Sequence, residues 1–595
     1  MEYYEDYKIS EYDWTILKRL IKYTKPYKSQ LLISAILLII SSLSEISLPY
    51  ITKLAIDKFI MTNTFNYNFL YLSILYLSIL IIIFLCSYYQ DYIVQSTGQY
   101  LMKDLRNDLF THIQNLPVTY FNKTPTGKIM TRVTNDVEAI NELFTAGVIT
   151  IIGDILILCG ILIAMLLLNV SLAIIVILIT PLIFIISYLF RKYVRETYNR
   201  VRFWLSKMNA FLQESVSCIS IIQIFNAEEK NFHHYDAINK EYRKANIDSI
   251  FYYALYYPAI ELVAAISTAS ILFFGGLSIL KMSLTFGILV AFIQYSYRFF
   301  SPISDLTEKY NIILSSIVAS ERIFKILDEP IQDKKIGIEF IIKEPPPVSF
   351  KNVSFAYKDT LVLDNVSFDV YPHQKVAIIG PTGSGKTTII NLLLKFYDNY
   401  KGTILINGID IKQISSTSLR KIIGTVFQEP FLFSKSLREN LYIGPKMIES
   451  HTLFSLTNNI IGEKFMKRFE NKLDYKIGER GIELSTGERQ LIAFTRALSI
   501  NPLLLILDEA TSSIDADTEF HIQNQLSKWL KNHTAIIIAH RLSTIKQVDN
   551  IILLVNGKIV EQGSHNELMK YESKYSLFCK YFLDQKNQML NSLPG

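Results

Sequence analysis

The chain reads KVAIIGPTGSGKTT from Lys375 to Thr388. The apolar run Lys375–Ile379 predicts a buried strand, and the residues Thr387–Phe396 predict a helix. The loop between them matches the pattern G-x-x-x-x-G-K-[ST], in which glycines allow backbone N–H groups to point into one concavity beside the positive end of a helix. This stretch therefore predicts a phosphate-binding loop within an α/β domain.

The side chains of this loop suit the phosphates of a nucleoside triphosphate. Lys386 would reach the β- and γ-phosphates, and Thr387 would hold a Mg²⁺ ion. A chance match in a glycine-rich loop is the competing explanation, and the flanking strand and helix argue against it. We expect ATP to lie against the whole run, namely Gly380, Pro381, Thr382, Gly383, Ser384, Gly385, Lys386, Thr387 and Thr388.

Two further apolar strands end in side chains that could serve this nucleotide. The strand Leu503–Leu507 is followed by Asp508, a carboxylate suited to Mg²⁺, and by Glu509, which could orient and polarise the attacking water. The strand Ala535–Ala539 is followed by His540, which could contact the γ-phosphate. A strand that simply ends in acids, or a lone structural histidine, is the alternative, so both assignments depend on the phosphate-binding loop upstream.

The composition of the 595-residue chain indicates contact with membrane lipid. Half of the residues are hydrophobic and only 19% are charged, whereas about a quarter are charged in a typical soluble protein. Sixty basic against 54 acidic residues leave a net charge of +6, which is too weak and too dispersed for a nucleic-acid partner. The four cysteines have no paired spacing, which disfavours a disulfide framework or a metal site and favours a reducing environment.

Six apolar stretches precede residue 325. Each is long enough to cross the hydrocarbon core of a bilayer, which takes roughly 20 helical residues. A tight hairpin at Asn169 separates the third from the fourth, whereas the loops after the second and the fourth are about 60 residues long and helical in pattern. Helices two to five should therefore extend far out of the membrane. The stretches cover about Gln30–Ile51, Asn68–Tyr89, Val148–Leu168, Ser171–Phe190, Tyr252–Leu280 and Phe286–Ile312.

The distribution of Lys and Arg predicts the orientation of these helices. Basic residues are frequent before the first stretch and in both long loops, while the short opposite loops offer only Lys53, Lys58 and Lys281. The positive-inside rule then places both termini and the ATPase domain in the cytoplasm, in a multi-pass protein of the cytoplasmic (inner) membrane. Residues 13–27 alternate apolar residues with lysines, like a helix lying on the inner leaflet.

The fold class that follows is multi-domain. A six-helix, all-α transmembrane domain with long cytoplasmic helical extensions precedes an α/β P-loop ATPase domain. Long apolar stretches give way to short alternating strand-like and helical runs near Pro330 and the run Pro345–Pro347, which mark the entry to the second domain. We expect an N-terminal cytoplasmic segment with the interfacial helix at 1–28, the transmembrane domain at 29–325, a linker at 326–345, the nucleotide-binding domain at 346–582 and a tail at 583–595.

The ordered set of motifs resembles an ABC exporter half-transporter of the multidrug and lipid exporter family, over about residues 13–582. Tyr357 matches the aromatic residue that stacks on adenine. Gln428 matches the Q-loop residue that senses Mg²⁺ and faces the membrane domain, and Asp515 matches the D-loop of the catalytic machinery. Further similar positions are the X-loop Lys476–Gly481, a first coupling region with Pro117, Phe121, Gly127, Arg132 and Asp136, and a second from Glu214 to Glu228.

This resemblance implies how ATP would be used. Two nucleotide-binding domains would pair head to tail around two ATP molecules. Each site would then join the Walker motifs of one chain, which are the phosphate-binding loop and the strand that ends at Asp508, to the signature loop of the other chain. Ser485 and Gly487 lie where a signature loop meets a helix, and both would face a γ-phosphate across the pair. The transmembrane domains of the two chains would move together with the nucleotide-binding domains, between inward-facing and outward-facing states.

The signature loop departs from the family pattern. The family has Leu-Ser-Gly-Gly-Gln, whereas this chain has Leu-Ser-Thr-Gly-Glu from Leu484 to Glu488. Thr486 adds a branched side chain where backbone approaches phosphate, and Glu488 places a negative charge near one. Because the catalytic and metal-binding positions are intact, we favour a heterodimer, whose second half-transporter carries the intact signature, over a homodimer that tolerates the change.

Three carboxylates, Glu45, Asp154 and Glu261, lie within or near the expected spans. Acids inside a membrane are costly and are often functional, which suggests a cavity for cations. The alternative, which we favour, is that these acids lie near span ends or contact water in a wide cavity.

The predicted function is ATP-driven export of hydrophobic or amphipathic compounds, drugs or lipids, across the cytoplasmic membrane. One alternative is an ATP-gated channel or a regulatory subunit built on the same scaffold. The intact Glu509 and His540 favour turnover over gating. Another alternative is a peptide exporter without a protease domain.

Overall fold

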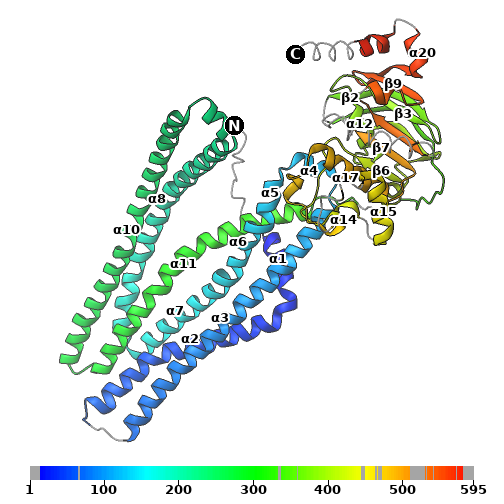
Figure 1. The fold of residues 1–595 in the computed structure, drawn as a ribbon. Coiled ribbons are helices and arrows are strands. Elements are labelled where there is room, and N and C mark those ends of the chain that lie inside the picture. Colours follow the sequence, from blue (N-terminus) through cyan, green and yellow to red (C-terminus); the bar gives the residue numbers. More distant parts are fainter. Residues whose placement is uncertain are drawn as a thin grey trace. The chain divides into compact units, whose positions relative to one another are not determined.

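The computed structural model describes residues 14–63, 67–332, 337–357, 360–443, 449–462, 466, 472–508, 530, 533–539, 542–570 and 573–580. The chain divides into two compact units (Figure 1). The first comprises Met1–Gln114 and Thr126–Glu329 and is helical, and the second comprises Asn115–Pro125 and Pro330–Gly595 and contains the sheets. The short segment 115–125 thus belongs to the second unit, although helices of the first unit flank it in sequence.

Long helices build the first unit, as the apolar stretches predict. α3 (Tyr67–Asn115), α8 (Val170–Ser217) and α10 (Glu228–Leu280) have 49, 48 and 53 residues. At about 1.5 Å per residue each is more than twice as long as the roughly 30 Å hydrocarbon core, which confirms that these helices continue beyond it. The others are α1 (Trp14–Thr24), α2 (Lys28–Ala55), α5 (Thr126–Thr131), α6 (Val137–Glu142), α7 (Ile149–Leu168), α9 (Ile219–Ile224) and α11 (Phe286–Leu327).

Five helical stretches of the described chain are long and apolar enough to cross a membrane. α11 forms the helix predicted over 286–312, but it is not among these five. Its crossing of the membrane therefore stays a prediction. The five are Lys18–Ile60, Tyr67–Asn115, Thr126–Leu168, Val170–Ser217 and Glu228–Leu280.

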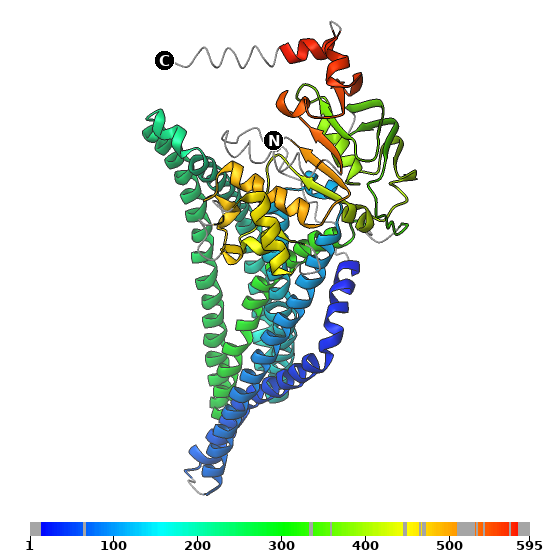
Figure 2. The ribbon, with the colours of Figure 1, turned by 45° about the vertical axis from the view of Figure 1, so that its right-hand side comes forward.

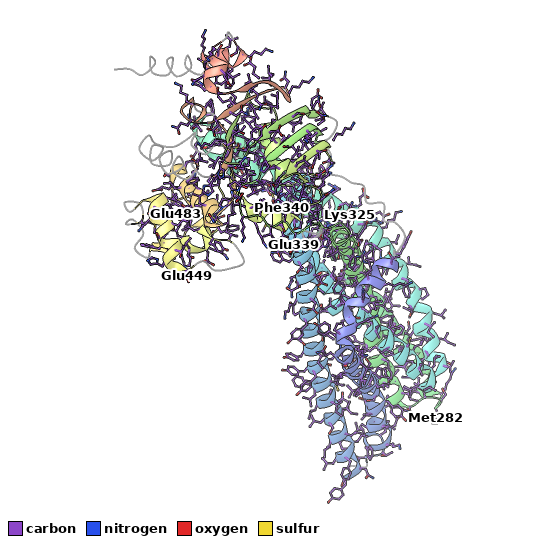
Figure 3. All side chains as sticks on the ribbon, turned by 90° about the vertical axis from the view of Figure 1, so that its right-hand side faces the viewer. Met282, Lys325, Glu339, Phe340, Glu449 and Glu483 are labelled. Atoms are coloured by element: carbon purple, nitrogen blue, oxygen red, sulfur yellow. The ribbon has the colours of Figure 1, made fainter. Side chains whose placement is uncertain are left out.

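Packing between its long helices organises the helical unit. α8 and α10 lie side by side (Figures 1 and 2), and α11 packs against α2, α7 and α10. Only Asn169 separates α7 from α8, and its side-chain oxygen accepts a 3.1 Å hydrogen bond from the N–H of Leu172, which confirms the predicted tight hairpin. Met282, in the turn between α10 and α11, and Lys325 lie at opposite ends of the unit (Figure 3).

The second unit contains two sheets. A four-stranded antiparallel sheet has the order β2-β1-β4-β5. A six-stranded sheet has the order β10-β9-β3-β8-β7-β6, in which all neighbours are parallel except β10 and β9. The strands are β1 (Val348–Ala356), β2 (Leu361–Val370), β3 (Lys375–Ile379), β4 (Lys401–Ile406), β5 (Ile409–Asp410), β6 (Ile423–Val426), β7 (Leu504–Asp508), β8 (Thr534–Ile538), β9 (Asn550–Val555) and β10 (Lys558–Gly563).

Alternate residues of β3 enter two different cores. Val376 and Ile378 join the core shared with the four-stranded sheet and α12, whereas Ala377 and Ile379 join the core beneath α17. Both faces of the parallel sheet are therefore covered, and each fully buried Val or Ile contributes about 1.5–3 kcal/mol. The helices here are α4 (Val118–Lys123), α12 (Lys386–Leu393), α13 (Ser416–Ile422), α14 (Leu437–Leu441), α15 (Ser450–Ile461), α17 (Thr486–Ser499), α19 (Leu542–Ile545) and α20 (His565–Met569).

A third, smaller core lies in the helical part of this unit. Leu437 of α14, Leu453 of α15 and Leu491 of α17 are buried in it together. Figure 3 shows Glu449 and Glu483 in this part, each just before one of its helices. The signature loop therefore belongs to a separately packed helical region attached to the sheet.

Three element boundaries differ from the sequence-based prediction. β7 runs from Leu504 to Asp508 instead of Leu503–Leu507, because Asp508 itself still pairs with Ile538 of β8. α12 ends at Leu393 instead of Phe396, because Lys395 adopts a positive φ of 56° that a helix does not tolerate. β8 runs from Thr534 to Ile538 instead of Ala535–Ala539, because its pairing with β7 begins at Thr534 and ends at Ile538.

Candidate functional site

The loop between β3 and α12 depends on its glycines. A Cβ atom on Gly380 would lie 2.0 Å from the backbone oxygen of Leu554, so any side chain there would collide with β9. Gly383 has a φ of +83°, and a Cβ there would have nothing within 4 Å. The loop is thus closely packed on the sheet and open at Gly383, the arrangement that a bound phosphate needs.

Two polar side chains inside the loop fit a phosphate group. Lys386 is only 7% exposed, and its Nζ donates hydrogen bonds to the backbone oxygens of Gly380 (2.9 Å) and Pro381 (3.0 Å). Ser384 is 2% exposed, and its Oγ has no hydrogen-bond partner among the described residues. Leaving a buried hydroxyl unpaired costs about 1–3 kcal/mol, and a phosphate oxygen would supply the missing acceptor.

The residues predicted to hold Mg²⁺ come from one edge of the six-stranded sheet. The Thr387 hydroxyl, at the start of α12, lies 3.4 Å from a carboxylate oxygen of Asp508, the last residue of β7. Gln428 follows β6, the parallel neighbour of β7, by two residues. Hydroxyl, carboxylate and amide oxygens are the hard ligands that Mg²⁺ prefers, so this set fits the ion.

Tyr357 offers an aromatic surface beside the loop. Its ring stands edge-on against Phe355 and Tyr397, with centroid distances of 4.9 and 5.2 Å, and its hydroxyl lies 3.2 Å from Thr388 Oγ1. The side chain is 44% exposed, which leaves room for a base to stack on it. Stacking of a base on an aromatic side chain contributes about 1–3 kcal/mol.

The side chains of the signature loop form hydrogen bonds within the loop itself. Ser485 and Glu488 form a capping box: the Ser485 hydroxyl accepts from the Glu488 N–H (3.2 Å), and the Glu488 carboxylate accepts from the Ser485 N–H (2.8 Å). Arg489 donates to the Thr486 hydroxyl (3.2 Å) and to the Leu484 carbonyl oxygen (2.9 Å). Both residues that depart from the family pattern, Thr486 and Glu488, are therefore engaged at the start of α17.

Arg496 anchors the other end of α17. Its guanidinium donates to the backbone oxygens of Asn440 (2.6 Å) and Phe431 (2.9 Å), and burial lowers its pKa to about 10. These bonds attach α17, the helix that begins at the signature loop, to α14 and to the loop that precedes α14.

Comparisons with known proteins cover both units. Residues 31–303 match the ABC transporter transmembrane region, and residues 363–512 match the ABC transporter domain. The chain belongs to the ABC transporters.

Its relatives match over almost the whole chain. The chain is 33% identical to an ATP-dependent lipid A-core flippase of Syntrophus aciditrophicus, over 94% of this chain and 93% of the relative. It is 34% identical to YheH of Bacillus subtilis, named "Probable multidrug resistance ABC transporter ATP-binding/permease protein", over 84% of this chain and 75% of the relative. A solved bacterial Atm1-family ABC exporter with ATP bound superposes with a TM-score of 0.79 at 25% identity, covering 94% of this chain and 98% of that one.

These matches establish a bacterial ABC exporter half-transporter, a multi-pass membrane protein in which a membrane region is fused to an ATPase domain. The ABC ATPase binds ATP and couples its hydrolysis to export, and ABC half-transporters act as dimers. The expected family, fold class and ATPase activity are therefore confirmed.

Three residues of the predicted catalytic set, Glu509, Asp515 and His540, lie outside the described residues. Their neighbours in sequence are described: Asp508 ends β7, and Ile538 ends β8, which lies between β7 and β3. Their roles stay predictions.

The structure pairs two of the three acids of the half-transporter's membrane region with cations on α11. Asp154 of α7 lies 2.5 Å from Lys309, and both side chains are less than 20% exposed. Glu45 of α2 lies 3.4 Å from Arg298, which also donates to the Glu45 backbone oxygen (2.9 Å). Glu261, on α10, is exposed and forms no ion pair with another described residue. The paired acids are already neutralised, which weighs against a cation cavity at those two positions.

Sequence reasoning missed the two partners of these acids, as well as Tyr397 in the ATPase domain. Arg298 and Lys309 are two basic residues inside the apolar stretch 286–312, while Glu45 and Asp154 are acids in or near other predicted spans. Buried charges of opposite sign in neighbouring helices could have indicated ion pairs between them. Tyr397 lies in the aromatic pair that follows α12, but nothing in the local pattern indicates its contact with Tyr357.

Proposed function

We propose that the half-transporter exports hydrophobic or amphipathic compounds, drugs or lipids, across the cytoplasmic membrane by alternating access. The observation that carries this proposal is the convergence of Lys386, Thr387 and Asp508 at one sheet edge, in a chain whose other unit has helices of membrane length. The substrate class is supported by the names of two relatives, a lipid A-core flippase and a multidrug resistance transporter.

Different residues of the ATPase domain would bind the base, the phosphates and the Mg²⁺ ion. Tyr357 would stack on adenine, and the amides of Gly380–Gly385 with Lys386 and Ser384 would bind the phosphates. Thr387, Asp508 and Gln428 would hold Mg²⁺, which when bound supplies positive charge to the phosphates.

Hydrolysis would require a water aligned with the γ-phosphate. Glu509 follows the metal-binding Asp508 directly and would accept a proton from that water as it attacks. His540 would contact the γ-phosphate from the neighbouring strand end, and Asp515 would contribute from the D-loop. Gln428, next to the metal, would respond to its presence.

We further propose that the partner is a different half-transporter. The Glu488 carboxylate accepts from the Ser485 N–H at 2.8 Å, so a phosphate that reaches Ser485 would meet this negative charge. Two unit charges about 6 Å apart repel each other by about 3 kcal/mol at an effective dielectric constant of about 20. The site that receives this signature loop would bind or hydrolyse ATP weakly, while the partner's intact signature would complete the site at Lys386 and Asp508.

Export is tested by reconstituting the dimer in lipid vesicles with Mg-ATP. We expect ATP hydrolysis to be stimulated by a transported drug or lipid, together with ATP-dependent movement of a fluorescent phospholipid between leaflets or of Hoechst 33342 across the membrane. A channel or regulatory subunit would instead give ATP-dependent ion conductance without substrate stimulation. The Asp508→Asn chain, reconstituted in the same way, is the control for ATP dependence.

The heterodimer is tested by purifying this chain alone and counting its ATP sites. We expect the isolated chain to show little hydrolysis per site, and activity to recover when the second half-transporter is co-expressed. Two equivalent sites that both hydrolyse ATP at full rate in the isolated chain would establish a homodimer and end the proposal.

A further inference from the structure

Glu261 of α10 has no counter-charge among the described residues of the chain. It lies nine residues, about 14 Å along the helix, inside the apolar stretch predicted over 252–280, counted from the end that is predicted to be cytoplasmic. The side chain is exposed, and its carboxylate forms no ion pair or hydrogen bond with another described residue. An ionised carboxylate within a membrane span is costly, so such a residue is functional by default and calls for a named partner.

The helices packed around Glu261 do not supply that partner. α10 itself has no Lys, Arg or His between residues 245 and 280. The stacked rings that join α8 and α10 set these helices antiparallel and place residues 181–189 of α8 opposite Glu261, and this run also contains no basic residue. The two bases within 286–312 of α11, Arg298 and Lys309, are already paired with other acids.

An exposed aromatic stripe leads along α10 to this carboxylate. Tyr253, Tyr257 and Glu261 follow one another at intervals of four residues, so each is the next one's neighbour on the helix surface. The rings of Tyr253 and Tyr257 are 38% and 46% exposed and stack with a centroid distance of 6.5 Å. Two exposed π-faces beside a negative charge have the chemistry that attracts an organic cation.

Packing against α8 holds these tyrosines in place. Phe190 of α8 stands edge-on to Tyr253, with a centroid distance of 5.2 Å, and stacks on Tyr256 at 4.0 Å. Tyr256 is buried, and its hydroxyl lies 3.3 Å from that of Ser187. Tyr257 in turn contacts Tyr256 at 5.5 Å. Side chains that are ordered in advance lose little conformational freedom on binding, so the stripe is a preorganised surface for a ligand.

We propose that Tyr253, Tyr257 and Glu261 form a binding site for a lipophilic organic cation, which is a substrate of the half-transporter. The inference rests on the proposed export function and narrows its substrate class. The carboxylate would neutralise the cation, and the tyrosine rings would contact its charged and apolar surface. An amphiphile whose polar group is a carboxylate or a phosphate would be repelled, so the site separates cationic drugs from anionic lipids.

The probes are tetraphenylphosphonium and tetraphenylborate, because these two ions have nearly the same shape and opposite charge. Equilibrium dialysis of the radiolabelled ions against the full-length protein in its dimeric assembly in lipid nanodiscs measures the Kd, and empty nanodiscs correct for uptake by lipid. ATP-driven uptake into inside-out vesicles measures transport. We expect saturable binding and uptake of tetraphenylphosphonium, and no saturable binding of tetraphenylborate.

Single substitutions test the charge and the rings separately. Glu261→Gln keeps the shape of the side chain and should raise the Kd for tetraphenylphosphonium about tenfold, the effect of one lost charge pair in a partly hydrated place. Tyr257→Leu should raise it about three- to tenfold, whereas Tyr257→Phe keeps the π-face and should leave it nearly unchanged. Glu241→Gln is the matched control, because it removes a charge from the same helix twenty residues away, outside the predicted span.

The outcomes separate this inference from the proposed export function. An unchanged Kd in Glu261→Gln, or equal binding of the two ions by the unmodified protein, would overturn the site. Dissociation of the dimer in Glu261→Gln would show that the carboxylate pairs with a base of the second half-transporter, and it would overturn the inference as well. If Glu261→Gln does not fold, the difference between Tyr257→Leu and Tyr257→Phe decides.

The export function has its own readout, which is ATP-driven movement of a fluorescent phospholipid or of tetraphenylphosphonium by the unmodified dimer. Movement of neither compound would contradict export. Movement of the phospholipid together with an unchanged Kd in Glu261→Gln would leave export standing and overturn the cation site alone.

Discussion

Glu488 replaces a neutral amide by a carboxylate of similar shape, so its effect is one of charge. The carboxylate lies at the positive end of α17 and holds the Ser485 N–H, which stabilises the free helix. The same charge opposes a γ-phosphate at that place. A residue that improves the capping of its own helix can thus weaken the site that the helix serves across the dimer.

Glu488→Gln should therefore strengthen ATP binding at the site that receives this signature loop. An amide oxygen can still accept from the Ser485 N–H, so the capping box and the thermal stability should change little. Removing a repulsion of about 1–3 kcal/mol should lower the Kd for ATP at that site by about 5- to 150-fold, measured by equilibrium binding to the assembled dimer.

The control for this change is Glu439→Gln. Glu439 forms the same capping box with Ser436 at the start of α14. An equal change in ATP affinity in both variants would show that the effect comes from helix capping in general, contrary to the proposed repulsion.

A second residue-scale prediction concerns the metal. Asp508→Asn removes the charge that faces the Thr387 hydroxyl at 3.4 Å and should reduce ATP hydrolysis by about 10²–10³-fold, while a fluorescent ATP analogue still binds. Chelating Mg²⁺ with EDTA should reproduce this effect in the unmodified protein, and added Mg²⁺ should reverse it. Hydrolysis that persists in EDTA would contradict a metal site at Thr387 and Asp508.

At the scale of elements, α11 holds the helical unit together through charges inside an apolar surrounding. Its Lys309 pairs with Asp154 of α7, and its Arg298 pairs with Glu45 of α2. Arg298 and Lys309 are 11 residues apart, which is about three helical turns, so they lie on nearly the same face of α11. One helix thereby fixes the positions of two others.

Lys309→Met should destabilise the protein by about 3–5 kcal/mol, because it leaves Asp154 as an uncompensated charge in a poorly hydrated place. The double variant Asp154→Asn with Lys309→Met should recover most of this loss. Thermal unfolding in detergent measures both effects. A double variant that is no more stable than Lys309→Met would show that the pair does not act as a unit.

α1, which is predicted to lie on the cytoplasmic side, is also held in place by an ion pair. Its Ile16 and Leu20 are buried in the helical unit, so this face of the predicted interfacial helix packs on protein. Arg19 donates two hydrogen bonds to Asp328, at 2.7 and 2.8 Å, and these hold the pKa of the Asp328 carboxyl below its ordinary value. The helix at the start of the chain is thus fastened to the residue that follows α11.

At the scale of the whole molecule, the distribution of Lys and Arg predicts which side of the membrane each turn faces. The turn at Asn226, between α9 and α10, and the turn at Met282, between α10 and α11, both have a residue with positive φ and an exposed side chain. The positive-inside rule predicts that Asn226 lies in the cytoplasm and Met282 outside.

This topology predicts the labelling of single cysteines. In a chain whose four native cysteines are replaced, a membrane-impermeant maleimide should label Met282→Cys in intact cells and leave Asn226→Cys unlabelled until the cells are opened. Both positions are exposed, so access by the reagent does not depend on unfolding. Labelling of Asn226→Cys in intact cells would reverse the orientation.

Several parts of this protein could be predicted because they depend on local sequence pattern. The strand, glycine loop and helix from Lys375 onward and the long apolar helices could be predicted because hydropathy, periodicity and glycine position act over a few neighbouring residues. The main errors were the starts and ends of elements, as at Leu393 and Thr534, where a left-handed backbone conformation or pairing with another strand sets the boundary.

The contacts between residues far apart in the sequence became visible in the three-dimensional structure alone. Asp154 finds Lys309, Arg19 finds Asp328, and Asn122 finds Tyr397 across separations of 155, 309 and 275 residues. No local pattern encodes such pairs, because they depend on how whole helices and sheets pack. A charge or hydroxyl that is removed from water costs free energy unless it is paired, and the packing of the elements determines which partner is within reach.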